Sequence, residues 1–310
     1  MIFINKIGGR CSCEIQIPNK RVKTEVATMK DVIRGLFVSV LFGALLSCGY
    51  ADGSVAAEAI PEPGKEPKVA AVAKAPEKTE PWVRTPEERA WEDILEASLG
   101  DYFLPHYKKA KAKGLETAWD YVRDDPALPR ILLIGDSISY GYTVPVRHAL
   151  AGKVNVHRAP TNCGSTQVAL STNRQLKKQE LEIWLGDGRW DLIHFNFGIH
   201  DSRGPVEEYV KRLELIAKRL KQTGAKLVFA NTTWGRDPDD KIIELNRAAA
   251  EVMARNGVPI NDLYQYMKPR KEEFRIAPDN SHFKEAGSRY LGEKVAGIIQ
   301  DHLKSSLPAP

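Results

Sequence analysis

Short apolar segments that alternate with helical patterns are the feature that most restricts the fold of residues 129–303. The segments are rich in Ile, Leu, Val and Phe, which is typical of strands buried on both faces of a parallel sheet. They are ILLIG (131–135), KVNVHR (153–158), DLIHFNFG (191–198), KLVFAN (226–231) and, more weakly, VPIN (258–261). Helical patterns occupy the intervals at about 144–151, 171–185, 205–222 and 239–256, and a last one follows at 284–303. The sequence therefore predicts an α/β fold in which helices cover both faces of a parallel sheet of about five strands.

The composition limits the classes of function. With 310 residues and 43% hydrophobic content, the chain can bury a sizeable core in one or two domains. The formal net charge is only +5, and basic and acidic residues alternate along the helical segments, so nucleic-acid binding has no compositional support. The glycines follow neither the dinucleotide-binding pattern nor the P-loop pattern, which argues against a nucleotide cofactor.

Residues 1–59 are predicted to be a leader whose signal core lies at 29–48. There, a basic start precedes GLFVSVLFGALLS, an apolar run of the length found in secretory signal peptides and too short to span a bilayer securely. LLSC resembles a bacterial lipobox ending at Cys48, which would then carry a lipid; small residues near Ala57 and Ala59 offer ordinary cleavage instead. Both outcomes stay open, and we expect an exported protein that is periplasmic, extracellular or held at the membrane only by a lipid on Cys48.

Three further regions are predicted after the leader. Residues 60–82 are rich in Pro, Ala, Glu and Lys and have few bulky apolar side chains, so we expect a disordered linker. TPEE at 85–88 has a cap, a proline and a glutamate in the order that begins a helix, and residues 83–128 are predicted to be a helical extension packed on the main domain. That domain is placed at 129–305. Its one cysteine, Cys163, excludes a disulfide framework and is interpreted as a small packing residue.

Ligands of such sheets bind beyond the carboxyl ends of the strands, so the residues that follow each strand are the candidates for function. They are Gly135-Asp136-Ser137, Asn162-Cys163-Gly164-Ser165, Gly198-Ile199-His200-Asp201 and Thr232-Thr233-Trp234, joined by Asp279-Asn280-Ser281-His282 before the last helix.

Ser137 and His282 are the candidates for covalent chemistry. A strand-to-helix turn exposes the Ser137 hydroxyl and points the N–H groups of the helix start toward a bound group. A serine needs an adjacent base, which His282 could supply, while Asp279 could accept a hydrogen bond from the other ring nitrogen. Taken singly, Ser137 is better explained as a helix cap and His282 as a solvent-facing residue. Their occurrence together at strand ends favours a Ser-His-Asp triad.

Four segments in order resemble the blocks of the SGNH (GDSL) hydrolases, over about residues 130–303, and most closely those of secreted bacterial members. They are IGDSIS (134–139), the glycine loop at Cys163-Gly164, GIHD (198–201) and DNSH (279–282). The resemblance implies a flavodoxin-like three-layer α/β/α sandwich and a serine esterase that needs no cofactor. It also implies that Ser137 is the nucleophile, His282 the base and Asp279 its orienting residue, with the N–H groups of Ser137 and Gly164 as oxyanion donors.

His200 departs from this family, which usually has asparagine there as a third oxyanion donor. The imidazole N–H of His200 could substitute for the amide. Alternatively, Asn162 supplies the amide and His200 contacts the substrate, or the site has only two donors. A further alternative is that His200 is a structural residue at the edge of the sheet.

Other residues near the strand ends could bind substrate. Candidates are Asp136, Asn162, Asp201, Arg203 and Trp234, the last by stacking on a sugar or an acyl group, although a core tryptophan is an equally good interpretation. Arg158 and Arg203 could hold an anionic group. No metal site is expected, because His194 lies within a strand, roughly 20 Å from His200 along an extended chain.

The expected function is hydrolysis of carboxylic esters through an acyl-enzyme. A small-molecule or glycan ester with a short acyl group is preferred, such as acetyl on a carbohydrate, because the chain has no long apolar lid. A lipolytic or thioesterase-type acyl hydrolase is the alternative within this class. From another class, the chain could be a glycan-binding or scaffold protein that kept the fold with little turnover.

Overall fold

The computed structural model describes residues 2–7, 10–15, 84–235 and 238–304. The predicted signal core at 29–48, both candidate processing sites and the predicted linker at 60–82 lie outside the described residues. The chain divides into two compact units, Met1–Ala75 and Pro76–Pro310. In the first unit, β1 (Ile2–Ile7) and β2 (Arg10–Ile15) pair as antiparallel strands.

A parallel five-stranded sheet forms the centre of the second unit. Its strands are β3 (Arg130–Ile134), β4 (Asn155–Arg158), β5 (Leu192–Asn196), β6 (Lys226–Ala230) and β7 (Ile260–Asn261). They lie in the order β4-β3-β5-β6-β7, and every neighbouring pair is parallel. This is a doubly wound order, in which the strand sequence reverses beside β3 and leaves a crevice at the carboxyl ends of β3 and β5. The predicted fold class is confirmed.

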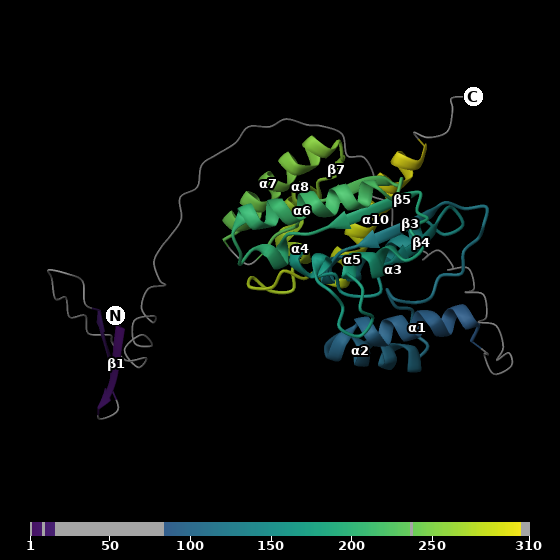
Figure 1. The fold of residues 1–310 in the computed structure, drawn as a ribbon. Helices are drawn as coiled ribbons and strands as arrows, with labels where there is room; N and C mark the ends of the chain where they lie inside the picture. Colours follow the sequence, from purple (N-terminus) through teal and green to yellow (C-terminus); the bar gives the residue numbers. More distant parts are fainter. Residues whose placement is uncertain (1, 8–9, 16–83, 236–237, 305–310) are drawn as a thin grey trace, which may run out of the picture. The chain divides into compact units, whose positions relative to one another are not determined.

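Helices cover both faces of this sheet, which gives three layers (Figure 1). One face packs against α3 (Ser137–Ala149), α8 (Leu263–Met267), α9 (Lys271–Phe274) and α10 (Glu285–Lys304). The other packs against α4 (Thr166–Leu170), α5 (Glu180–Leu185), α6 (Val206–Lys221) and α7 (Asp240–Asn256). Two short 3-10 turns are η1 (Ile199–Asp201) and η2 (Lys268–Arg270). Alternate residues of β3 serve the two layers: Ile131 and Leu133 face the first, and Leu132 and Ile134 face the second.

Two helices differ from the sequence prediction. The helix expected from about residue 144 begins at Ser137, because Asp136 caps it by accepting a hydrogen bond from the Ile138 N–H at 2.9 Å. Of the helix expected at 171–185, only the part from Glu180 is helical, as α5, and the short helix α4 ends at Leu170, before the expected start. Between them, the side chain of Asn173 accepts hydrogen bonds from the N–H groups of residues 175 and 176 and stabilises a turn in place of a helix.

The helical extension before the sheet contains α1 (Pro86–Ser98) and α2 (Gly100–Ala112), which lie side by side (Figure 1). The predicted start of α1 is observed as a capping box between Thr85 and Glu88. The prediction of helix is wrong beyond α2, since Gly114 adopts a left-handed conformation (φ +69°) and the chain from there to β3 forms turns. Arg147 on α3 donates to the carbonyl oxygens of residues 117 and 118, which ties the extension to the domain.

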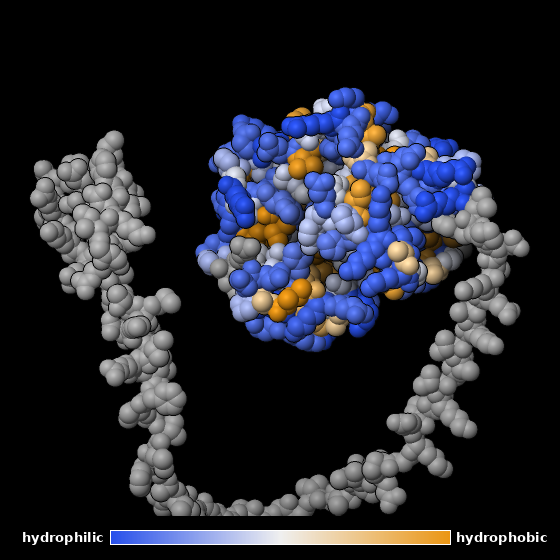
Figure 2. Space-filling model, turned by 90° about the horizontal axis from the view of Figure 1, so that it is seen from below, coloured by the Kyte–Doolittle hydropathy of each residue, from blue (hydrophilic) through white to orange (hydrophobic). Residues whose placement is uncertain are grey.

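The surface of this unit is largely hydrophilic on the face shown in Figure 2, where apolar residues form small separate patches. Among the residues that the structure describes, no helix has both the length and the apolar character needed to cross a membrane.

Candidate active site

Ser137 follows the turn between β3 and α3 and is the first residue of α3. A side chain at Gly135 would not fit this turn, because an added Cβ would lie 2.6 Å from Ser139 Cβ. The half-buried Ser137 therefore follows a tight bend, and its N–H, at the first position of the helix, has no acceptor within the helix.

His282 reaches this serine from a loop that is distant in sequence. Ser137 Oγ and His282 Nε2 are 2.8 Å apart, although 145 positions separate the two residues in the chain. The loop is anchored by the next residue, Phe283, which is buried and packs edge-on against Trp234 at 4.5 Å between ring centroids. A proton can pass directly from the hydroxyl to the imidazole over this distance.

The other ring nitrogen of His282 contacts Asn280. Asn280 Oδ1 lies 2.8 Å from His282 Nδ1 and also accepts a hydrogen bond from the His282 N–H at 2.9 Å. Because an amide oxygen only accepts, Nδ1 carries the proton and Nε2 offers its lone pair to Ser137. The prediction that Asp279 accepts this hydrogen bond is corrected: Asp279 is exposed, and the turn places its neighbour against the ring.

The glycine loop after β4 lies beside the serine. The Cys163 N–H donates to the Gly135 carbonyl oxygen at 3.2 Å, which brings the next residue, Gly164, next to the β3–α3 turn. Gly164 is left-handed (φ +62°), a conformation that glycine adopts without strain. Two adjacent turns thus present the N–H groups of Ser137 and Gly164 at one end of the sheet, the arrangement that stabilises an oxyanion.

Two side chains on this rim are available as a third donor. Asn162 is half-buried, and its amide Nδ2, the donor, has no hydrogen bond among the described residues; its buried Oδ1 has no partner there either. His200 is exposed in η1, four residues after the end of β5, the strand that pairs with β3, and in the described part of the chain no hydrogen bond to its ring is found. Each has donor capacity left for a ligand.

Two aspartates predicted to bind substrate are structural instead. Asp136 is 1% exposed and caps α3. Asp201 is 5% exposed and accepts hydrogen bonds from the N–H and the hydroxyl of Thr166, at 3.1 and 2.5 Å, with Arg212 3.9 Å away. Burial raises the pKa of the Asp201 carboxyl, although the bonds from Thr166 oppose this. Asp201 thus fastens the loop after β5 to the start of α4, just beyond Gly164.

The other predicted contacts separate into buried and exposed residues. Trp234 is 1% exposed and belongs to the core, so the prediction that it stacks on substrate is wrong; its packing against Phe283 supports the His282 loop instead. Arg203 is exposed, and its place after η1 leaves it a candidate for substrate contact.

Arg158 has a role that the sequence did not reveal. It is 2% exposed and donates to the carbonyl oxygens of Gly135 and Asp136, both at 3.0 Å, and to the hydroxyls of Ser139 and Thr143. Burial lowers the pKa of its guanidinium. The predicted contact with an anionic substrate group is therefore wrong, and Arg158 holds the two residues that precede the nucleophile. The signal in the sequence was an arginine at the end of an apolar strand, a position where a charged side chain needs buried hydrogen-bond partners.

Two further titratable side chains, His194 and Cys163, are buried in the core. His194 is fully buried in β5 with Nε2 3.2 Å from Asn261 Nδ2, and burial lowers its pKa to about 3. Burial raises the pKa of the Cys163 thiol to about 12. Within the described ranges, no three His, Cys, Asp or Glu residues are grouped so as to hold a metal ion.

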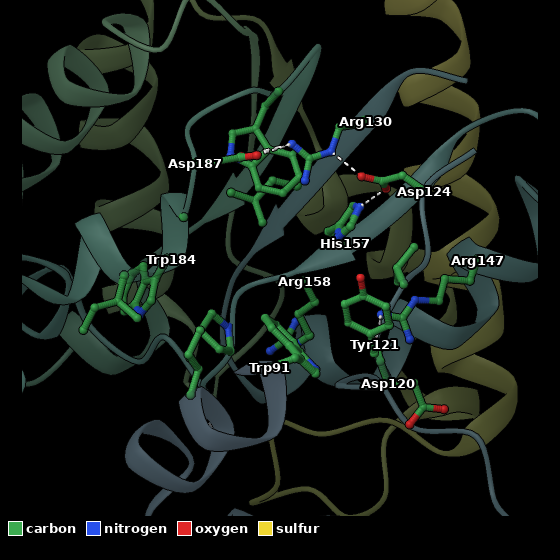
Figure 3. Close-up of a pocket in the computed structure, with 17 residues that line it drawn as sticks. Trp91, Asp120, Tyr121, Asp124, Arg130, Arg147, His157, Arg158, Trp184 and Asp187 are labelled. Carbon is green, nitrogen blue, oxygen red and sulfur yellow. Dashed lines mark hydrogen bonds and ion pairs between the residues drawn. The ribbon is translucent and has the colours of Figure 1, made fainter. Parts of the chain in front are cut away.

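A separate cavity of about 230 Å³ lies between the extension and the edge strand β4 (Figure 3). Its charged groups neutralise one another: Arg130 pairs with Asp124 and Asp187, and His157 pairs with Asp124. Neither Ser137 nor His282 lines it, so it is distinct from the candidate active site.

Comparison with known proteins identifies the family. The model of the GDSL-like lipase/acylhydrolase family matches residues 133–290, more than half of the chain, including Ser137, Gly164, His200 and His282. The chain belongs to this family. It is a serine hydrolase that acts on ester bonds, as the sequence predicted.

Solved structures similar to this member of the GDSL-like family include three esterases or acylhydrolases. A lipase/acylhydrolase from Enterococcus faecalis is 24% identical, with a TM-score of 0.48 over 56% of this chain and 97% of that one. The acetyl xylan esterase AlAXEase is 15% identical, with a TM-score of 0.46 over 55% and 99%. Axe2, an acetylxylan esterase from Geobacillus stearothermophilus, is 16% identical, with a TM-score of 0.45 over 55% and 94%. No curated protein matches the chain.

Proposed function

We propose that this GDSL-family hydrolase removes short acyl groups, acetyl above all, from carbohydrate esters, with Ser137 as nucleophile and His282 as general base. The observation that carries the proposal is the 2.8 Å contact between Ser137 Oγ and His282 Nε2, in the tautomer that leaves Nε2 unprotonated.

The reaction proceeds in two halves. His282 Nε2 takes the hydroxyl proton as Ser137 Oγ bonds to the ester carbonyl carbon, and the negative carbonyl oxygen faces the N–H groups of Ser137 and Gly164. His200 contributes the third donor. The tetrahedral species collapses, the proton passes from Nε2 to the departing alcohol oxygen, and an acyl-enzyme remains. Water that gives a proton to Nε2 then attacks the acyl carbon, and the acid leaves as Ser137 regains its proton.

The shape of the rim supports a small acyl group and a large polar alcohol. His282 and His200 are both exposed and Ser137 is half-buried, so the reacting atoms lie near solvent. Two cavities among the described residues, of about 230 and 750 Å³, are lined by other parts of the chain, and a third, beside Asp136 and Ile138, holds only about 10 Å³. A long acyl chain needs an enclosed apolar channel to leave water, and none of these three cavities offers one at Ser137.

The test combines covalent labelling with a series of chain lengths. Wild type, Ser137→Ala and the control Ser171→Ala, which changes an exposed serine after α4, are treated with a fluorophosphonate probe and assayed on p-nitrophenyl acetate, butyrate and octanoate. We expect labelling and turnover in wild type and Ser171→Ala only, with kcat/KM falling as the chain lengthens. A preference for octanoate would support the lipolytic alternative. No labelling of wild type would support a glycan-binding or scaffold protein.

We also propose that the chain is exported, as the apolar segment at 35–47 and the LLSC motif suggest. Expression of the full chain in a bacterium, followed by fractionation and analysis of the mature N-terminus, tests this. Membrane association that is lost in Cys48→Ser would support lipid attachment. An uncleaved protein in the cytoplasm would overturn export.

A further inference from the structure

We propose that the N-terminal extension completes the substrate site, with Tyr102 and Tyr140 forming an exposed aromatic wall on which a sugar ring of the alcohol part stacks. This inference rests on the proposed carbohydrate esterase function and names the part of the molecule that recognises the sugar. Tyr102 and Tyr140 are called the aromatic wall below.

Tyr140 places one end of the wall beside the nucleophile. It lies three residues after Ser137 on α3, a spacing that puts two side chains on the same face of a helix, with Cβ atoms about 5–6 Å apart. The next residue, Gly141, faces Ser288 on α10, just beyond the His282 loop. The base therefore approaches Ser137 on one flank, and Tyr140, 37% exposed, occupies the other.

The corner between α1 and α2 lies beside the oxyanion loop. The Thr161 hydroxyl donates to the carbonyl oxygen of Ser98 at 2.8 Å, and the Asn173 side-chain amide donates to that of Ala97 at 3.4 Å. Thr161 lies three residues before Gly164. These contacts fix the end of α1, and with it the first turn of α2 that carries Tyr102, next to the loop that presents the Gly164 N–H.

A continuous run of rings joins the two tyrosines of the aromatic wall. Tyr140 packs on Trp119 with ring centroids 4.7 Å apart, and Trp119 meets Phe103 edge-on at 5.3 Å. Phe103 in turn meets Tyr102 edge-on at 4.9 Å. Trp119 is 1% exposed and forms a rigid base, whereas Tyr102 is 68% exposed. Tyr140 is thus held in place by a buried ring before a ligand arrives, which lowers the entropy cost of binding.

The chemistry of the aromatic wall suits a sugar better than a fatty chain. A pyranose ring presents C–H groups on its faces and hydroxyls at its edge, which match the ring faces and phenolic hydroxyls of tyrosine. An aliphatic chain would leave most of its surface in water on so open a wall. The extension that carries Tyr102 lies before residue 133, where the match to the family model begins, whereas Tyr140 lies within the matched range, so the wall combines a residue of the extension with one of the matched domain.

The test compares a sugar ester with an ester that cannot stack. Wild type, Tyr140→Ala, Tyr102→Ala and the double variant are assayed on glucose pentaacetate and on ethyl acetate. Tyr140→Phe is included because it keeps the ring. Tyr121→Ala is the matched control, since Tyr121 is an exposed tyrosine of the same extension that lines the separate cavity at β4.

We expect the double variant to raise KM for glucose pentaacetate by about 5- to 150-fold, the product of the about 2- to 13-fold that each lost aromatic contact produces, with kcat within twofold. Ethyl acetate kinetics should stay within twofold in every variant, and Tyr121→Ala should behave as wild type on both esters. Tyr140→Phe, which keeps the ring and loses the hydroxyl, should raise KM for the sugar ester less than Tyr140→Ala does. An equal loss on both esters would overturn the inference, because it would show a structural role. Unchanged KM for the sugar ester, or hydrolysis of ethyl acetate alone by wild type, would also overturn it. If wild type hydrolyses ethyl acetate and Ser137→Ala does not, the proposed esterase chemistry holds. Any of the failures above then concerns the aromatic wall alone.

Discussion

Replacing Asn280 tests which residue holds His282: Asn280, as in the structure, or Asp279, as the family resemblance implies. The structure gives His282 Nδ1 a neutral amide acceptor at 2.8 Å and leaves Asp279 exposed. A hydrogen bond between neutral groups contributes about 0.5–1.5 kcal/mol, so Asn280→Ala should lower kcat by about 2- to 13-fold. Loss of a carboxylate that directly orients a catalytic histidine costs about 10⁴-fold in serine proteases. The two arrangements therefore predict effects that differ by orders of magnitude.

The assay measures kcat and KM on p-nitrophenyl acetate for Asn280→Ala, Asp279→Ala and Asn280→Asp. We expect Asp279→Ala to stay within about twofold of wild type, and Asn280→Asp, which keeps an acceptor at the same place, to remain active. Thermal melting of each variant shows whether the loop still folds. A fall of more than about 100-fold in Asp279→Ala, with Asn280→Ala close to wild type, would refute the reasoning, because it would show that the carboxylate is the working partner of His282.

Three further perturbations test the oxyanion donor, the turn and the buried histidine. His200→Ala should lower kcat by about 10²- to 10³-fold with little change in KM, and His200→Asn should retain activity; a rise in KM alone would place His200 in substrate binding. Gly135→Ala should destabilise the protein by about 1–3 kcal/mol in urea unfolding, since the new Cβ would meet Ser139 at 2.6 Å, and an unchanged midpoint would contradict this. Burial lowers the pKa of His194 to about 3 in the folded protein. Below about pH 6.5 the unfolded chain therefore binds a proton at His194, whereas the folded protein does not. Stability is then complete above that pH and falls by about 2 kcal/mol between pH 7 and pH 5, a loss that His194→Asn should remove; an identical loss in the variant would refute it.

The strands could be predicted because their hydrophobic composition is a property of each segment by itself. Residues 131–134 and 192–195 are buried on both faces, so their composition marks them without knowledge of their neighbours. The start of α3 could not be predicted from the sequence, because Ser137, Ser139 and Gly141 are weak helix formers. The Asp136 cap and packing against α10 outweigh that weakness, and packing is visible only in three dimensions.

The polar residues at the strand ends could likewise be predicted only in part. Ser137, Gly164 and His282 could be selected from the sequence because each follows or precedes an element whose direction is known. Whether a neighbouring polar side chain faces substrate or turns inward was not determined locally. Asp201 turns inward because Thr166, at the start of α4, supplies its hydrogen bonds.

The sequence by itself determined the α/β class, the order of strands and helices, and the two residues that face each other across the rim. The tertiary structure decided which atom holds His282, that Arg158 braces the nucleophile turn, and that the extension reaches the same rim. The physical reason is that hydrophobic burial follows from a segment's own composition. A hydrogen bond depends instead on the position and direction of a partner atom, and here that position is set by loop geometry or by segments far away in the chain.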